Sequence, residues 1–169
     1  VYPSTIIRPL YWWQFLTAGF VHAEGLNHIL FNMLGLYCFG MRLEERYGRR
    51  EFLRFYLVAV VVGMVGWSAT HHFLLHEGDN IVCYGASGGV TAALLLFCLL
   101  YPTATILLSF LFPVPAWLLG IIIIGQNLFI RQIGVASDVH LFGAAFALGY
   151  WYFGWNFGRL PGLDKLHRL

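Results

Sequence analysis

Apolar residues along the chain form five long runs that are separated by short polar segments. A helix needs about 20 predominantly apolar residues to cross a bilayer, and within lipid its backbone must satisfy its own hydrogen bonds. We therefore predict five transmembrane helices, over residues 26–41, 52–75, 87–101, 106–128 and 135–157. The fourth run contains Pro113 and Pro115, which lack a backbone N–H, so we expect a kink or an offset near its start.

The segment before the first run, residues 1–25, is too short and too interrupted to cross a membrane. It carries Tyr11, Trp12 and Trp13, and the side chains of Trp and Tyr favour the level of the lipid headgroups. We predict an interfacial segment here. With the five helices it forms one all-α membrane domain, a polytopic helix bundle over residues 1–158, and residues 159–169 form a tail.

The composition supports an integral, multi-pass membrane protein. Hydrophobic residues make up 59% of the chain, charged residues only 11%, and the mean hydropathy is +0.71. Soluble domains carry about 25% charged residues, so the composition argues against a soluble enzyme. The net charge of +2 is too small to indicate a nucleic-acid partner. The cysteines show no CxxC pair and no zinc spacing, so we assign them no role.

The basic residues predict the orientation of the chain. One cluster follows the first predicted helix and a second follows the fifth, and together they hold eight of the ten basic residues: Arg42, Arg46, Arg49, Arg50 and Arg54, then Arg159, Lys165 and Arg168. Five crossings place both clusters on one side, and basic loops favour the cytoplasm. We therefore predict that the C-terminus is cytoplasmic.

Four polar residues interrupt the apolar runs at a similar depth. His28 and Asn32 lie near the outer end of the first predicted helix, and their i, i+4 spacing places them on one face. Ser87 begins the third helix, and His140 lies one to two turns into the fifth. All three helices run inward from the outer side. Polar groups in a bilayer usually face the protein interior, so we expect these four side chains to share one pocket in the outer leaflet.

The residue types in this pocket suit nucleophilic catalysis. A serine hydroxyl is a weak nucleophile until a base takes its proton, and histidine is the usual base. A serine that begins a helix is surrounded by free backbone N–H groups, which favour an oxyanion. Gly85 and Gly88 flank Ser87 and permit a tight turn and a close backbone approach.

Each residue also has a structural interpretation. A serine between glycines often serves helix packing, an intramembrane histidine can serve ion transport, and Asn32 can join two helices by a hydrogen bond. His71, His72 and His76 are more typical of a solvated cluster than of a metal site, because no carboxylate pattern accompanies them. The residues alone leave catalytic and structural roles both open.

Four motifs resemble those of the rhomboid family of intramembrane proteases, in the family's order, between about residues 11 and 150. His22 and the segment 28–34 resemble the histidine-rich entry to its second helix, and the segment 40–48 resembles its cytoplasmic helix-end motif. Residues 85–88 match the GxSG motif around the nucleophile, and His140 with Gly143 matches the HxxG motif of the last helix. Trp13 and Gln14 resemble the Trp-Arg pair of the first loop.

This resemblance implies the rhomboid helical core and an intramembrane serine endopeptidase with a dyad of Ser87 and His140. His28, Asn32 and the backbone N–H of Ser87 would stabilise the oxyanion, and Gly85, Gly88, Gly143 and His22 would support the site. The expected partners are the lipid bilayer and single-pass or other membrane proteins, cut in or beside their transmembrane segments. The resemblance implies no metal and no cofactor.

The chain departs from the family pattern at several points. The family core has six helices and this sequence predicts five, so we expect a fragment that lacks the first. Thr91 stands where the family often has an aromatic residue beside the histidine, and Ala147 replaces a glycine one turn after Gly143.

Two other functions compete with proteolysis. A catalytically inactive rhomboid-like protein would bind membrane helices without cutting them, but such relatives typically lack the serine or the histidine. A transporter would use the histidines as proton carriers, but transporters often show paired repeats, and this sequence shows none.

Overall fold

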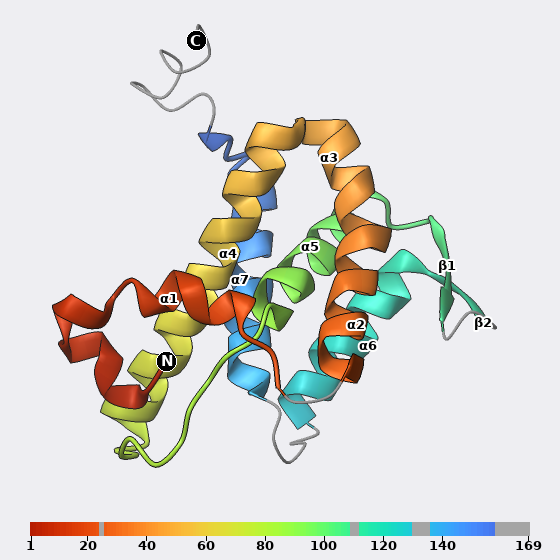
Figure 1. Cartoon of the computed structure of the whole chain (residues 1–169). Helices are drawn as coiled ribbons and strands as arrows, with labels where there is room; N and C mark the ends of the chain where they lie inside the picture. Colours follow the sequence, from red (N-terminus) through yellow and green to blue (C-terminus); the bar gives the residue numbers. More distant parts are fainter. Residues whose placement is uncertain (24–25, 109–111, 130–135, 158–169) are drawn as a thin grey trace, which may run out of the picture.

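The computed structural model describes residues 1–23, 26–108, 112–129 and 136–157. These residues are mostly helical, and the predicted helical bundle is confirmed, with one small β-hairpin added to it. Figure 1 shows the arrangement: α4 (Arg49–Ala69) and α7 (Ser137–Tyr152) stand side by side, α5 (Ser87–Leu100) crosses against them, and further helices flank this group.

The centre of the bundle consists of α4 (Arg49–Ala69), α5 (Ser87–Leu100) and α7 (Ser137–Tyr152), which pack against one another. Their contact surfaces combine small and aromatic residues. Among the aromatic residues, Phe55 packs on Phe146 and Tyr150. Ala92, Ala93 and Ala147 are fully buried between the helices. Small side chains allow helices to approach closely, and van der Waals packing is the main attraction between helices in lipid.

The first predicted span is part of a longer helical segment. It comprises α2 (Leu26–Gly35), a π-helical turn η4 (Leu36–Gly40) and α3 (Met41–Tyr47), so the helix continues beyond the predicted end at Met41. Gly48 then ends it with a positive φ of 82°, a backbone conformation that glycine adopts without steric cost. The chain reverses there and enters α4.

The fourth predicted span is wrong in its first part. Instead of a helix from residue 106, the chain forms an antiparallel hairpin of β1 (Thr105–Leu108) and β2 (Phe112–Pro115), and α6 (Ala116–Phe129) follows. Thr105 is opposite Pro115, and Leu107 is opposite Pro113. The two prolines explain the error, because neither can donate a helical hydrogen bond and each clashes with the preceding turn. The helix therefore begins directly after the second proline.

The helices differ in length relative to a bilayer. In the described part of the chain, one helical segment, Arg49–Leu74, is long and apolar enough to cross a membrane by length and composition. It joins α4 to the π-helix η5 (Thr70–Leu74) and matches the second predicted span. α5 and α6 are apolar but have 14 residues each, about 21 Å against a hydrocarbon thickness of about 30 Å. The first residue of α5 can therefore lie below the membrane surface.

The N-terminal segment forms only short helices: η1 (Pro3–Ile7), η2 (Pro9–Tyr11), α1 (Gln14–Thr17) and η3 (Ala18–Phe20). Hydrogen bonds fasten it to the bundle. The hydroxyl of Ser68 on α4 donates to the carbonyl of Pro3 at 2.9 Å, and the hydroxyl of Ser4 donates to the carboxylate of Asp79 at 2.6 Å. None of these helices is long enough to span, as predicted.

Different segments of the chain lie at the two ends of the bundle. In Figure 1 the α3–α4 junction lies at the top, whereas the N-terminal helices and the loop after η5 lie at the lower left. At the top, Glu51 at the start of α4 accepts hydrogen bonds from the Tyr150 hydroxyl at 2.7 Å and the Phe157 N–H at 2.6 Å. The predicted basic tail, residues 159–169, lies outside the described residues.

Candidate active site

Ser87 and His140 are in direct contact. Ser87 is the first residue of α5, and His140 is the fourth residue of α7. The serine Oγ lies 2.8 Å from the imidazole Nε2, within hydrogen-bond distance. Both residues are half-buried. The structure therefore brings together a hydroxyl and a base that are 53 residues apart in the sequence.

Two glycines set the distance between the helices that carry these side chains. A Cβ on Gly143 would lie 2.2 Å from the backbone oxygen of Gly88, and a Cβ on Gly88 would lie 2.7 Å from Cγ1 of Val139. Real Cβ atoms do not approach other atoms so closely. The glycines one residue after Ser87 and three residues after His140 thus allow the backbones of α5 and α7 to touch.

The turn before Ser87 depends on Gly85. This residue has a φ of 119°, a region open to glycine but strained for other residues. Its N–H donates to the carbonyl of Ala18 at 2.9 Å, which fastens the turn to the N-terminal segment. A Cβ at this position would lie 3.0 Å from Cε1 of His28. The imidazole of His28 therefore lies directly beside the turn that leads into Ser87.

The start of α5 leaves backbone N–H groups without a helical partner at and directly after Ser87. The first helical bond runs from the N–H of Val90 to the carbonyl of Ala86 at 3.0 Å. The N–H groups of Ser87, Gly88 and Gly89 precede this bond and have no partner within the helix. They carry the partial positive charge of a helix N-terminus, which favours negative charge next to the Ser87 hydroxyl.

His28 presents a donor on the side that faces the turn. Its Nδ1 accepts a hydrogen bond from the backbone N–H of Ala23 at 3.1 Å. A neutral imidazole has one donor and one acceptor nitrogen, so the proton lies on Nε2. The ring of His22 packs edge-on against that of His28, with centroids 5.1 Å apart, and the buried Nε2 of His22 has no hydrogen-bond partner among the described residues.

Asn32 lies one turn after His28 and is buried. Its amide NH2 donates one hydrogen bond to the carbonyl of His28 at 2.8 Å, which leaves a second N–H on the same nitrogen. His28 lies beside Gly85, and Gly35 lies against Val90. Asn32, between these two contacts on α2, is therefore at the level of Ser87.

The sequence analysis missed Asn127, in the last turn of α6. Its Oδ1 lies 2.7 Å from Nδ1 of His140, the ring nitrogen that faces away from Ser87. The available signal was an amide pair, Gln126 and Asn127, at the end of an otherwise apolar run. A polar residue within an apolar helix usually faces the protein interior.

Asp138 is two residues from His140 but contacts a different histidine. Its carboxylate lies 2.9 Å from Nε2 of His71, whose Nδ1 contacts Glu77 and whose ring stacks on Trp67. Asp138 therefore does not complete a serine, histidine and aspartate triad. In the described ranges, no group of three or more His, Cys, Asp or Glu side chains is arranged so that it could hold a metal ion.

Cys83 lies four residues before Ser87 in the loop that leads to α5. Burial raises the pKa of its thiol to about 12, so the residue remains a neutral thiol at physiological pH. A neutral thiol is a poor nucleophile, and Cys83 does not compete with Ser87 for this role.

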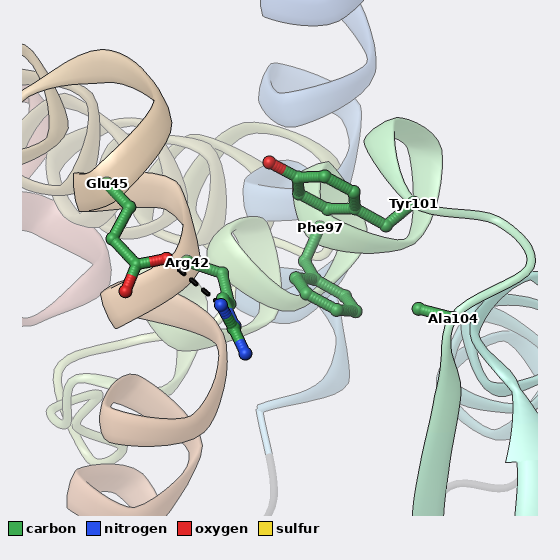
Figure 2. Close-up of a pocket in the computed structure, with 5 residues that line it drawn as sticks. All are labelled: Arg42, Glu45, Phe97, Tyr101 and Ala104. Carbon is green, nitrogen blue, oxygen red and sulfur yellow. Dashed lines mark hydrogen bonds and ion pairs between the residues drawn. The ribbon is translucent and has the colours of Figure 1, made fainter.

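A separate cavity of about 300 Å³ lies at the other end of α5. Figure 2 shows Arg42 and Glu45, paired on α3, facing the rings of Phe97 and Tyr101, with Ala104 beyond. Phe97 and Tyr101 are ten and fourteen residues after Ser87. This cavity is therefore not part of the serine and histidine site.

Comparisons with known proteins agree on one family. A model of the rhomboid domain matches residues 9–157. The chain is 34% identical over 150 residues to RHOMBOID-like protein 12, mitochondrial, of Arabidopsis thaliana, covering 80% of this chain and 44% of that protein. It is 33% identical over 79 residues to the putative rhomboid protease YdcA of Bacillus subtilis, covering 47% of this chain and 36% of that protein.

A third relative is the rhomboid protease GluP of Bacillus subtilis, which is 31% identical over 96 residues, covering 57% of this chain and 18% of that protein. The chain spans less than half the length of each of these three relatives. No solved structure matches it significantly.

Proposed function

The chain belongs to the rhomboid family, which is integral to membranes, and on that premise we propose that it is an intramembrane serine endopeptidase. Ser87 is the nucleophile and His140 is the general base. The observation that carries this proposal is the 2.8 Å contact between Oγ of Ser87 and Nε2 of His140. This distance is within the range of about 2.6–3.2 Å that proton transfer requires.

In the first step, Oγ of Ser87 attacks the carbonyl carbon of the scissile peptide bond while Nε2 of His140 accepts the hydroxyl proton. The tetrahedral oxyanion then collapses, and the histidine returns the proton to the leaving amine. Water attacks the acyl-serine with the same base, which releases the acid and restores the hydroxyl. The reaction consumes one water and requires no metal or cofactor in this scheme.

The oxyanion is stabilised by donors from two helices. The backbone N–H of Ser87 comes from the start of α5, and the Nε2–H of His28 and the second N–H of Asn32 come from α2. Each donor supports the transition state more than the ground state, because full negative charge develops only when the carbonyl carbon becomes tetrahedral.

The proposed substrates are membrane-anchored proteins that are cut within or beside a transmembrane segment. A helical peptide bond has its carbonyl hydrogen-bonded and is covered by side chains, so the substrate must unwind locally before Ser87 can reach it. Segments with weak helix formers such as glycine and proline are the preferred targets.

The orientation proposed for the chain places the α3–α4 junction in the cytoplasm and the site in the outer leaflet. Support comes from the arginines at this junction, which lie at the opposite end of the bundle from the loop after η5 (Figure 1). A membrane-impermeant maleimide applied outside intact cells should label Asn80→Cys but not Glu45→Cys. The reverse pattern would overturn the orientation.

The function is tested with a serine-reactive fluorophosphonate probe and a cleavable transmembrane reporter. The native protein should be labelled and should cut the reporter, whereas Ser87→Ala should do neither. Ser137→Ala is the matched control, because Ser137 also begins a helix, which is α7 rather than α5. It should retain labelling. The proposal would be refuted by equal labelling of the native protein and Ser87→Ala, or by a folded native protein that does not cut the reporter.

A further inference from the structure

The imidazole of His140 is held from both sides. Nε2 faces Oγ of Ser87 at 2.8 Å, and Nδ1 faces Oδ1 of Asn127 at 2.7 Å. The three side chains come from α5, α7 and α6. This is the linear order of nucleophile, base and orienting group, with an amide as the third member.

A second contact determines which end of the Asn127 amide faces the histidine. The NH2 group of Asn127 donates to the carbonyl of Ile123, one turn earlier on α6, at 2.8 Å. If the amide were flipped, its oxygen would face the Ile123 carbonyl, and two acceptors would be in contact. The oxygen must therefore face His140, so Nδ1 of the imidazole carries the proton.

The tautomer matters because a neutral imidazole can act as a base at only one nitrogen. With the proton on Nδ1, the lone pair of Nε2 is directed at the Ser87 hydroxyl. An asparagine that turned its NH2 toward Nδ1 would place the proton on Nε2 and remove the base. The bond between Asn127 and Ile123 prevents this arrangement.

An amide also suits the location better than a carboxylate. A buried carboxylate requires a compensating charge or several donors, and its desolvation in a membrane is costly. The carboxylate of Asp138, two residues before His140 in the sequence, is engaged with His71. A neutral carbonyl oxygen instead holds the ring and stabilises the imidazolium of the transition state without leaving an unpaired charge when the base is neutral.

We propose that Asn127 is a positioning residue that sets the tautomer and the orientation of His140. This inference rests on the proposed function of Ser87 and His140, and it adds α6 to the helices that build the site. Asn127 acts through the histidine and does not touch the substrate.

The kinetic test compares three variants in the full chain. Asn127→Leu removes both amide groups at similar size and should lower kcat for reporter cleavage about 10–100-fold, with KM changed by less than about twofold. Asn127→Asp keeps an acceptor oxygen opposite Nδ1, so its kcat should lie between those of Asn127→Leu and the native protein, because the carboxylate must be desolvated. Gln126→Leu, which removes the neighbouring exposed amide, should match the native protein.

The direct readout is ¹⁵N NMR of histidine-labelled protein in detergent, with the His140 signals identified by their loss in His140→Phe. In the native protein and in Gln126→Leu, neutral His140 should carry its proton on Nδ1. In Asn127→Leu the population should shift toward the Nε2-protonated tautomer. An unchanged tautomer in Asn127→Leu, or an Nε2 proton in the native protein, would overturn the inference.

The two proposals can fail separately. Labelling that does not depend on Ser87 would refute the protease function, but the histidine spectra would still decide whether Asn127 orients the ring. Conversely, Ser87-dependent labelling with unchanged kcat and tautomer in Asn127→Leu would retain the dyad and refute the role of Asn127.

Discussion

The central helices and the flanking helices of this bundle contribute differently to the site. α4 buries nine of its residues, whereas α2 buries a single residue, Asn32. α6 buries three residues, all in its first two turns: Ala116, Leu119 and Gly120. The outer faces of the flanking helices expose large apolar side chains, such as Phe31 at 67% and Phe129 at 86%, which suits contact with lipid tails.

The central helices set the distance between the reacting groups, and the flanking helices carry the side chains that are proposed to assist them. The contact between Ser87 and His140 depends on two central helices whose backbones touch at Gly88 and Gly143. The proposed side-chain donors and the proposed orienting amide come from α2 and α6, which bury few residues. Substitutions on the flanks should therefore change the rate without unfolding the protein, and substitutions at the centre should do both.

The largest expected effect comes from a flanking donor. His28→Phe keeps a ring beside Gly85 but removes the Nε2–H, and it should lower kcat about 10²–10³-fold, because one oxyanion donor is lost. The thermal unfolding midpoint should stay within about 2 °C of the native value, which corresponds to less than about 1 kcal/mol. Reporter cleavage and tryptophan fluorescence in detergent measure the two quantities.

His72→Phe is the matched control for this substitution. His72 lies on η5, and its ring contacts Phe73 rather than the site. It should leave kcat unchanged. If the unfolding midpoint of His28→Phe fell by much more than about 2 °C, α2 would support the fold as well as the chemistry. The contrast between the flanking and the central helices would then be refuted.

The next effect comes from the centre. Gly143→Ala places a Cβ 2.2 Å from the backbone oxygen of Gly88, so α5 and α7 must separate. We expect a loss of about 2 kcal/mol in the free energy of unfolding, as for other overpacked cores. Labelling by the fluorophosphonate probe should fall as well, because the serine moves away from its base.

Gly125→Ala on α6 is the comparison for this variant. A Cβ there meets no atom within 4 Å from the described residues outside its own helical turn, and alanine is favoured over glycine in a helix by about 0.5–1 kcal/mol. This variant should be as stable as the native protein or slightly more stable. If both alanine variants had the same stability, close contact at Gly143 would not hold the centre together.

The smallest effect concerns the N-terminal segment and is seen in acid. The hydrogen bond from the Ser4 hydroxyl, followed by the Ser4 N–H and the charge of Arg8, lowers the pKa of Asp79 from its usual 3.8. A lowered native pKa means that the carboxylate stabilises the fold above the unfolded pKa, and that this contribution is lost as the pH falls through the native pKa. Limited proteolysis of the N-terminal segment should therefore increase below about pH 4.

Asp79→Asn isolates this carboxylate from the other acids of the chain. The variant should show the higher proteolysis rate already at pH 6, and its rate should rise less between pH 6 and pH 3 than that of the native protein. Identical pH profiles would mean that Asp79 does not fasten the segment. The kcat at pH 7 should change little, because Asp79 lies on the loop outside the site.

Much of the architecture followed from local patterns. The apolar runs placed the helices, since a helix in lipid must be apolar along its length. Gly85 and Gly88 were recognisable because a tight turn and touching backbones require residues without a side chain, whereas Gly143 was singled out only by its resemblance to the HxxG motif of the family. The prolines were noticed, but they produced a hairpin rather than a kink, because residues 105–108 can pair with residues 112–115, and pairing partners are not encoded in hydropathy.

Local pattern was therefore sufficient for the helical class, for the residues that can supply a nucleophile, a base and donors, and for their similar depth. The i, i+2 spacing of Asp138 and His140 indicated that these two side chains point apart, but it could not indicate that Asn127 faces Nδ1 of His140 or that Asp138 faces His71. Depth along a helix follows from sequence position, but the direction in which a side chain points depends on how the helices rotate and pack. That packing is a sum of contacts between distant segments, and it exists only in the folded bundle.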